Sequence, residues 1–215
     1  RDACATEWRG YTHHPFLSAM AAGTLPKAAF RSYLIQDYIF LRHFARAYGL
    51  AAYKAESLAE IRAAAKGLSA IIDVEIGLHK KYCAGWGVDV AALESAEEGD
   101  ATLAYTGYVL ERGMAGDLLD LHVALAPCIV GYGEIGARLL ADKNTRLEGN
   151  PYRDWIEMYG GADYQEIALQ AVGYLDTIAE TRGAAGRRAS LIATFRQATR
   201  LETEFWQAGL AAKDG

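Results

Sequence analysis

Apolar residues recur three and four positions apart along almost the whole chain, and only 4 of its 215 residues are proline. This spacing places apolar side chains on one face of each helix, whereas a strand needs alternation with a period of two. We find no convincing strand pattern, and so few prolines leave long helical stretches uninterrupted. The pattern therefore predicts an all-α, single-domain multi-helix bundle spanning residues 1–215, with any site built between facing helices.

Glycines and capping residues predict where the helices begin and end. Thr24 is the expected N-cap of the second helix, Ser57 opens a capping box, and Asp117 caps a later helix. Residues 163–166 resemble a further capping box, and residues 88–100 are expected to form a polar connection. The expected helices cover roughly residues 6–22, 26–54, 57–84, 101–114, 117–142, 151–160, 163–182 and 187–212.

Charge and cysteine content disfavour several classes of protein. The net charge is −5, and no basic run is longer than Arg187-Arg188, so we do not expect a nucleic-acid partner. Cys4, Cys83 and Cys128 are far apart and have no metal-binding spacing, which suits a reducing cytoplasm. The apolar runs are interrupted by charge, and no signal-peptide pattern opens the chain, so we expect neither a membrane span nor a signal peptide.

Cys128 lies on an apolar helix face, between Leu125 and Tyr132 at helical spacing. Pro127 removes one helical hydrogen bond just before the thiol, and Gly131 leaves space beside it. A buried cysteine commonly acts as a small apolar residue, so the thiol alone does not indicate a reactive site.

Two carboxylates also lie on apolar helix faces. Asp37 is flanked at helical spacing by Tyr33 and Leu41, and Glu202 by Ala198 and Phe205. Burying a charge costs several kcal/mol unless it is paired or hydrogen-bonded. Carboxylates bonded to tyrosine or arginine would explain either residue alone. Together with Cys128 they predict a functional site, because buried titratable groups converge at such sites.

Aromatic side chains lie on the same inner faces. Phe40 lies about one turn beyond Asp37 and Phe205 about one turn beyond Glu202, so each carboxylate has an aromatic neighbour on its own helix. The chain has 13 tyrosines, most of which we expect to serve packing and one hydrogen bond. Together these residues suit a flat aromatic ligand. The inward tyrosines are Tyr33, Tyr105, Tyr108, Tyr132 and Tyr159.

Glu75 and His79 are four residues apart on the third expected helix, so a metal site has to be weighed. Bundle iron sites use Glu-x-x-His twice, whereas this chain has Glu-x-x-x-His once. We therefore expect a hydrogen bond between these two side chains rather than metal coordination, and the predicted site contains no metal.

The chain resembles the TenA family, also called thiaminase II, which has the haem-oxygenase-like all-α fold. The resemblance covers nearly the whole chain, and the order and spacing of its motifs are specific although each motif alone is weak. The motifs are His14-Pro15-Phe16, Gly23-Thr24-Leu25-Pro26, Leu34-Ile35-Gln36-Asp37-Tyr38, Glu75-x-x-x-His79, Tyr105-Thr106, Ala126-Pro127-Cys128 with Tyr132, Tyr159-Gly160-Gly161 and Glu202-Thr203-Glu204-Phe205-Trp206.

The resemblance implies a role for each candidate residue. Cys128 would be the nucleophile, Asp37 would bind the amino group of a pyrimidine, and Glu202 would contact a ring nitrogen. Tyr159, which we count with these as catalytic, would hydrogen-bond near the thiol and the reacting carbon, as would Tyr132. Three further residues would frame the ring: Phe40, Tyr105 and Phe205.

The cysteine-bearing branch of the family hydrolyses 4-amino-5-aminomethyl-2-methylpyrimidine, and also thiamin, to the hydroxymethylpyrimidine in thiamin salvage. The resemblance also implies a homotetramer. Adding a thiolate to the ring carbon while an acid protonates a ring nitrogen breaks aromaticity and lets the amine leave. The thiol needs activation, for which Asp37 or a tyrosine network is the candidate. Neither step requires a metal or an organic cofactor, so we expect none.

Other possibilities remain open. Phe40 stands where relatives often have tyrosine, and Ile129 and Val130 stand where some have larger aromatic residues, so the choice between thiamin and the smaller pyrimidine is open. The alternative functions are a non-catalytic pyrimidine-binding or regulatory protein and a haem or metal oxidase of the same fold. The oxidase is suggested by His13, His14 and the Glu75/His79 pair.

Overall fold

The computed structural model describes residues 1–212, and within that range every regular element is helical, as predicted. Two π-helical turns, Ala70–Glu75 and Pro127–Gly131, connect α4 to α5 and α8 to α9. The α-helices are α1 (Ala5–Thr12), α2 (Pro15–Ala22), α3 (Lys27–Lys54), α4 (Leu58–Ser69), α5 (Ile76–Gly85), α6 (Val90–Ser95), α7 (Asp100–Ala115), α8 (Leu118–Ala126), α9 (Tyr132–Ala141), α10 (Arg153–Gly160), α11 (Ala162–Thr181) and α12 (Arg188–Ala211).

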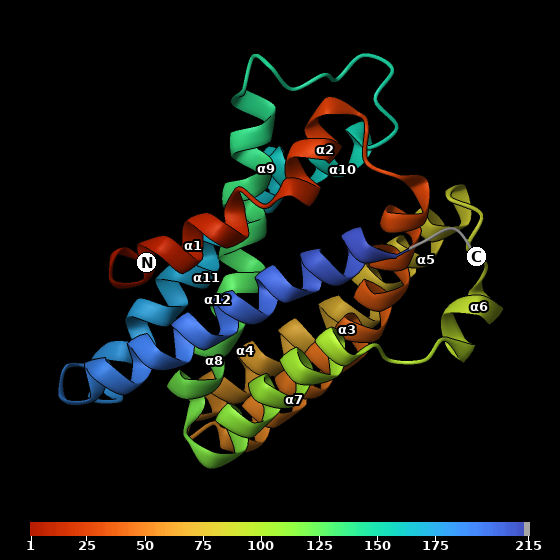
Figure 1. The fold of residues 1–215 in the computed structure, drawn as a ribbon. Helices are drawn as coiled ribbons and strands as arrows, with labels where there is room; N and C mark the ends of the chain where they lie inside the picture. The colour runs from red at the N-terminus through yellow and green to blue at the C-terminus, as the bar shows by residue number, and fades with distance from the viewer. Residues whose placement is uncertain (213–215) are drawn as a thin grey trace.

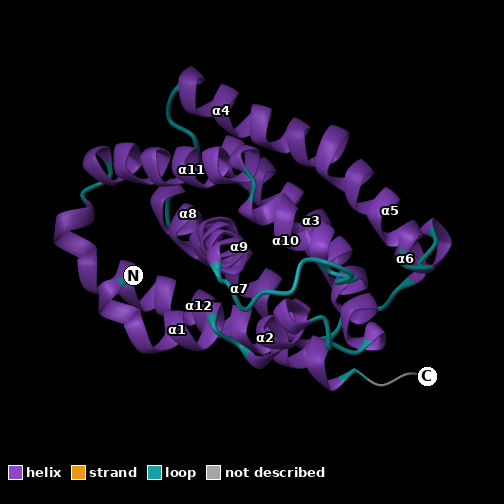
Figure 2. Ribbon diagram, turned by 90° about the horizontal axis from the view of Figure 1, so that it is seen from above, coloured by secondary structure: helices purple, strands orange, loops and turns teal. Residues whose placement is uncertain are grey.

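The helix α12 is central to the bundle and packs against α1, α3, α7 and α8 (Figure 1). The long helix α3 packs against both α4 and α7, while α11 packs against α8 and the π-helical turn that follows it. Seen from above, α4 and α11 lie on one side of α8 and α9, and α1 and α12 lie on the other (Figure 2). Any group on α3, α8 or α12 that points inward therefore faces the middle of the bundle.

The expected helix over residues 6–22 is divided in the structure. The helix α1 ends at Thr12, and α2 begins at Pro15. Proline has no backbone N–H to continue a helix, but it is well suited to the first helical position. The ring of His14 caps the new helix, because its Nδ1 accepts a hydrogen bond from the Phe16 backbone N–H at 3.2 Å.

Two predicted caps were wrong. The helix α3 begins at Lys27 without a side-chain cap, and Thr24 Oγ1 instead donates to Ala19 O at the end of α2. The expected box at residues 163–166 does not form, and Gly161 occupies the N-cap of α11. The Gln165 amide donates instead to backbone carbonyls of α9 and α10, so a tertiary contact has replaced the local one. Residues 88–100 also contain the short helix α6, which the prediction missed.

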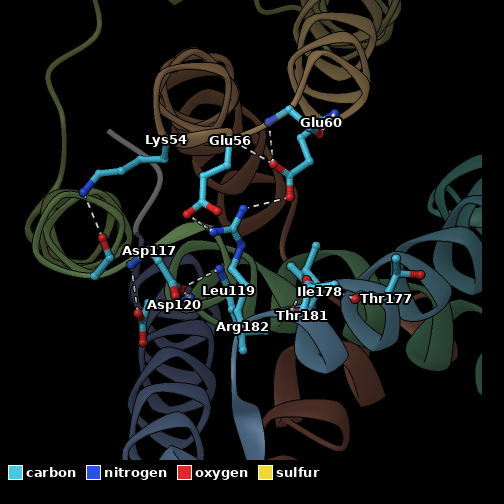
Figure 3. Close-up of polar contacts among 12 residues, drawn as sticks. Lys54, Glu56, Glu60, Asp117, Leu119, Asp120, Thr177, Ile178, Thr181 and Arg182 are labelled. Atoms are coloured by element: carbon cyan, nitrogen blue, oxygen red, sulfur yellow. Dashed lines mark hydrogen bonds and ion pairs between the residues drawn. The ribbon is translucent and has the colours of Figure 1, made fainter.

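The capping box at Ser57 is confirmed, and it forms part of a charged cluster that connects distant helices (Figure 3). Ser57 and Glu60 bond each other's backbone N–H groups at the start of α4. The Arg182 guanidinium at the end of α11 bonds Glu60 at 2.8 Å and also Glu56. The predicted cap at Asp117 is confirmed as well, since its carboxylate accepts two backbone hydrogen bonds. The contacts of Arg182 with Glu56 and Glu60 connect the end of α11 to the start of α4.

One continuous stretch, Leu118–Ala141, is long and apolar enough to cross a membrane by composition alone. Within the described structure it is a core helix, and 78% of the tested window is buried inside the bundle. It packs against α11 and α12 and carries Cys128 in its middle.

The apolar core consists of two clusters of buried side chains. One is dominated by aromatic residues, including Tyr33, Trp155 and Trp206, and the other by aliphatic residues of α3, α8 and α12. Cys128 belongs to the aliphatic cluster, while Tyr132, only four residues later, belongs to the aromatic one. The predicted site therefore lies where the two clusters meet.

Candidate active site

A cavity of about 520 Å³ opens between the helices, and all eight predicted site residues line it. They come from α3, α7, α9, α10, α12 and the π-helical turn after α8. Their roles remain predictions, but their convergence is now observed. The eight residues are Asp37, Phe40, Tyr105, Cys128, Tyr132, Tyr159, Glu202 and Phe205.

The π-helical turn Pro127–Gly131 sets the position of the thiol. Pro127 has no N–H for the normal helical bond, and a wider turn leaves backbone carbonyls open to side chains. The Cys128 thiol donates to Leu125 O with a separation of 3.0 Å, and Tyr11 Oη donates to Pro127 O at 3.3 Å. Tyr164 Oη likewise donates to Ile129 O at 3.3 Å. Side chains thus stabilise the wide turn, and such turns are frequent at functional sites.

Cys128 is protonated in the free protein. Its side chain is buried, and burial raises the pKa of the thiol well above its ordinary value, with further increases from Glu202 and Asp37. The thiol therefore requires a proton acceptor at the moment it reacts. In the structure it bonds a backbone carbonyl and not Asp37, so any proton transfer to Asp37 has to wait for substrate.

Glu202 is the most deeply buried of the three titratable groups, with 1% of the residue exposed. Burial raises its pKa from 4.5 to about 8, although a hydrogen bond from Tyr105 opposes the rise. Tyr105 Oη donates to Glu202 Oε1 at 2.9 Å. At neutral pH the carboxyl group is therefore mostly protonated and can act as an acid toward a ring nitrogen.

Asp37 differs from Glu202 because it has a nearby histidine. Burial raises its pKa to about 6, and His79 lowers it relative to burial alone. The His79 Nδ1 lies 3.6 Å from Asp37 Oδ2, and Tyr33 Oη donates to the same oxygen at 3.5 Å. Asp37 is therefore mostly ionised at neutral pH, while Glu202 is mostly protonated.

The spacing of Glu75 and His79 predicted a hydrogen bond between their side chains, but His79 has other partners in the structure. Its Nε2 donates to the backbone carbonyl of Leu34 at 2.8 Å, and no hydrogen bond to Glu75 is found within residues 1–212. A carbonyl oxygen only accepts, so Nε2 carries a proton and donates it to this bond, while Nδ1 on the other side of the ring faces the Asp37 carboxylate. The prediction of a local Glu-His bond was wrong because α3 lies close enough to supply both partners.

The predicted aromatic frame is also present. The rings of Phe40 and Tyr105 lie 5.2 Å apart, and Phe40 meets Phe205 edge-on at 6.4 Å. On another side of the cavity, Tyr132 and Tyr159 meet edge-on at 5.0 Å. Rings in these orientations suit a planar ligand, which can stack on one face and meet ring edges elsewhere.

A close helix contact positions Tyr159. A Cβ atom on Gly136 would lie 2.3 Å from the Tyr159 carbonyl carbon, so only glycine allows α9 and α10 to approach this closely. The contact holds the end of α10, and with it the Tyr159 ring, against Tyr132. The Tyr159-Gly160-Gly161 motif therefore ends where the backbone of α10 lies in close contact with that of α9.

Sequence reasoning missed several cavity residues. Tyr164 was assigned to a helix cap, yet its ring lines the cavity and packs on Tyr159 at 4.7 Å. Tyr48, His122 and Tyr174 also line the cavity, toward its outer end. The helical spacing of Tyr48 places it on the inward face of α3, so this residue could have been predicted. His122 and Tyr174 could not, because nothing in the local sequence shows that α8 and α11 lie side by side.

The histidines that suggested an oxidase do not meet in the cavity. His13 contacts Thr12, and His14 caps α2, so both belong to the α1–α2 connection. Among residues 1–212, no group of three or more His, Cys, Asp or Glu side chains is arranged to hold a metal ion. What the cavity does offer is one thiol, carboxyl groups with separated pKa values, and aromatic walls.

Fold and site together define an all-α protein of the haem-oxygenase-like class with a thiol- and carboxyl-lined pocket. A domain of unknown function from Shewanella denitrificans, described as having that fold, superimposes with a TM-score of 0.74 at 17% identity, over 96% of this chain and 88% of its own. The chain belongs to the TENA/THI-4/PQQC family, whose model matches residues 1–212.

Individual relatives agree with this assignment. An aminopyrimidine aminohydrolase of Halalkalibacterium halodurans is 34% identical over 93% of this chain and 88% of its own length. An uncharacterized protein of Haemophilus influenzae is 39% identical, with 94% and 93% covered. The crystal structure of a TenA family transcription regulator from Silicibacter superimposes with a TM-score of 0.88 at 47% identity, covering 97% and 93%.

Proposed function

We propose that this protein is an aminopyrimidine aminohydrolase of the thiaminase II type. It would hydrolyse 4-amino-5-aminomethyl-2-methylpyrimidine, and thiamin, to the hydroxymethylpyrimidine in thiamin salvage. The observation that carries the proposal is one cavity in which Cys128 faces two carboxyl groups of separated pKa, about 6 for Asp37 and about 8 for Glu202. Pairs of groups separated in this way indicate distinct acid and base roles.

In the first half of the reaction, Asp37 accepts hydrogen bonds from the ring amino group and Glu202 donates to a ring nitrogen. The Cys128 sulfur forms a bond to a ring carbon as its proton moves to the Asp37 carboxylate. The electron pair of the ring C=N bond moves to nitrogen, which takes the Glu202 proton. The ring electrons then form a C=C bond to the exocyclic carbon as the C–N bond of the aminomethyl group breaks, and the amine leaves with the proton returned by Asp37.

In the second half, water adds to the exocyclic carbon, forming the new C–O bond, and gives one proton to the Asp37 carboxylate. The ring nitrogen returns its proton to Glu202, and the C–S bond breaks to restore aromaticity as the departing Cys128 thiolate takes the proton from Asp37. Tyr132 and Tyr159, whose rings meet at 5.0 Å in the cavity wall, would hydrogen-bond the leaving amine and the incoming water. The product is the hydroxymethylpyrimidine, and Cys128 is regenerated.

The test follows the product by mass spectrometry for wild type, Cys128→Ala and the control Cys4→Ala. Cys4 is buried near the chain start and donates to Ile192 O, away from the cavity lining. We expect Cys128→Ala to lower kcat by about 10³-fold or more and the control to stay within about 2-fold. Equal turnover by wild type and Cys128→Ala would remove the nucleophile from the mechanism.

A non-catalytic pyrimidine-binding protein is the second candidate. Two observations favour this candidate. The Cys128 thiol is buried and protonated, and the Silicibacter protein that is 47% identical to this chain is described as a transcription regulator. This candidate predicts tight binding of the pyrimidine without product, and equal affinity in Cys128→Ala. The product assay and calorimetry on the same samples separate the two functions.

We also propose that the protein acts in the cytoplasm as a homotetramer with a small-molecule substrate. All three cysteines are free in the structure, as a reducing compartment requires. Several large apolar side chains are exposed, and contiguous apolar surface commonly marks interfaces. The most exposed of these apolar side chains are Tyr53, Leu58, Met114 and Leu169. Light scattering coupled to size-exclusion chromatography measures the oligomeric state.

A further inference from the structure

A third carboxylate lines the cavity and has no role in the reaction described above. Glu75 lies at the end of the π-helical turn Ala70–Glu75, between α4 and α5. Among residues 1–212 its carboxylate makes no hydrogen bond and no ion pair, whereas Asp37 and Glu202 each accept a hydrogen bond from a tyrosine. His79, its expected partner, faces Asp37 instead. The Glu75 carboxylate is therefore free to bind a ligand.

The π-helical turn sets the direction of this side chain. Ala70, Ile71 and Glu75 line the cavity, while the three residues between Ile71 and Glu75 are exposed. Residues five apart lie on one face of a π-helix, whereas they diverge on an α-helix. The wide turn therefore places Glu75 on the face that lines the cavity, and such turns are frequent at functional sites.

The negative charge of Glu75 acts on side chains from three other helices. Burial is the largest cause of the raised pKa of Asp37 on α3, Tyr159 on α10 and Tyr164 on α11, and the charge of Glu75 adds to all three increases. These three side chains also line the cavity. Glu75 therefore lies within electrostatic range of the groups that surround the reacting atoms.

The cavity offers Glu75 no positive charge of its own. Lys66 is the one lysine or arginine among the lining residues, and it is exposed. Glu75 keeps solvent-exposed surface, yet desolvation by the protein around its carboxyl group raises its pKa, and His79 opposes the rise. A cation bound beside Glu75 would favour the charged form of the carboxyl group. The chemistry of this position therefore suits a cationic ligand group.

Tyr159 supplies a second polar atom within electrostatic range of Glu75. Its ring is packed against Tyr132 and Tyr164, and among residues 1–212 its hydroxyl makes no hydrogen bond. A protonated primary amine has three N–H donors and no acceptor, while a carboxylate and a hydroxyl oxygen both accept. Glu75 and Tyr159 together therefore match a protonated amine in charge and in hydrogen bonding.

We propose that Glu75 recognises the aminomethyl group of the substrate as a protonated primary amine, with Tyr159 as the second acceptor. This inference rests on the proposed function, since it names the residue that binds the nitrogen of the leaving amine. That nitrogen takes the Asp37 proton as its C–N bond breaks, so it is positively charged at the step in which Glu75 stabilises it. The three carboxyl groups thus divide the substrate: Asp37 and Glu202 bond the ring, and Glu75 bonds the substituent.

The test is calorimetry of two ligands that differ in one group: aminomethylpyrimidine, with a protonated amine, and hydroxymethylpyrimidine, with a neutral hydroxyl. Cys128→Ala is the background, so that neither ligand is converted. We expect Glu75→Gln to weaken binding of the aminomethyl ligand about 10- to 100-fold, the range of a hydrogen bond to a charged group, and that of the hydroxymethyl ligand less than about 2-fold. With Cys128 restored, Glu75→Gln should lower kcat/KM for aminomethylpyrimidine by a similar factor.

Asp73→Asn is the matched control, because Asp73 is exposed in the same turn and does not line the cavity. Asparagine keeps an oxygen that can accept the hydrogen bond from Ser69, so this variant changes the charge alone. It should leave both affinities unchanged. Glu75→Asp, which keeps the charge on a shorter side chain, should retain part of the preference for the amine. Circular dichroism checks that each variant folds.

The outcomes separate this inference from the proposed function. If wild type hydrolyses aminomethylpyrimidine but Glu75→Gln weakens both ligands equally or weakens neither, the assignment of Glu75 is overturned and the function stands. If wild type hydrolyses nothing, a loss of affinity in Glu75→Gln that is confined to the aminomethyl ligand supports Glu75 while the function fails. An aminomethyl ligand that does not bind wild type overturns the assignment in either case.

Discussion

Replacing Glu202 with glutamine should change how stability depends on pH, even before any activity is measured. Folding raises the pKa of Glu202 from 4.5 to about 8, so between these values the folded protein binds a proton that the unfolded chain has released. Protonated Glu202 therefore stabilises the folded protein fully below pH 4.5, and this stabilisation is lost as the pH rises from 4.5 through 8. Between pH 5 and pH 9 the loss is about 4 kcal/mol. Glutamine is neutral throughout and does not incur it.

The assay is thermal unfolding of wild type and Glu202→Gln at several pH values and one protein concentration. For a chain of this size, 1 kcal/mol corresponds to roughly 2–4 °C, so the difference in Tm should be small at pH 5 and about 8–16 °C in favour of the variant at pH 9. Glu204→Gln is the matched control, because Glu204 is exposed on the same helix. It should follow wild type across the pH range.

The reasoning is refuted if the two curves stay parallel from pH 5 to pH 9, or if Glu202→Gln loses stability relative to wild type as pH rises. Parallel curves would mean that Glu202 is ionised in the folded protein at neutral pH. In that case the hydrogen bond from Tyr105 at 2.9 Å would outweigh burial, and Glu202 could not supply the proton to a ring nitrogen.

Two further perturbations test the surroundings of the site. His79→Leu removes the group that lowers the pKa of Asp37, so we expect the acidic limb of the pH profile of kcat/KM to move to a higher pH; an unchanged limb would show that Asp37 does not depend on this neighbour. Gly131→Ala places a Cβ atom 2.3 Å from the Tyr11 ring and should lower the free energy of unfolding by about 1–3 kcal/mol in urea denaturation, whereas Gly107→Ala, with no atom within 4 Å, should raise it by about 0.5–1 kcal/mol. Equal effects of the two alanines would contradict the close packing at Gly131.

Local signals predicted most of the fold. Apolar spacing identified nearly all the long helices, and the caps at Ser57 and Asp117 form as expected. The failures lie where a local choice competes with a tertiary one. The Gln165 amide reaches carbonyls of α9 and α10 instead of completing a capping box, because bonds between helices were available to it.

The site itself was foreseen as a set of residues but not as a set of contacts. Apolar faces around Asp37, Cys128 and Glu202 predicted that these groups point inward, and all three line one cavity. Helical spacing reports which way a side chain points from its own helix, so it could not tell which helix would face it.

The sequence by itself determined the helical class, most of the helix boundaries and the inward direction of the thiol and the two carboxyl groups. Only the tertiary structure decided that Tyr105 bonds Glu202, that His79 faces Asp37 and that the cavity continues to His122. These pairings join helices far apart in the chain. They depend on how packed helices cross and on the wide turn after Pro127, which the three-four spacing of any single helix does not specify.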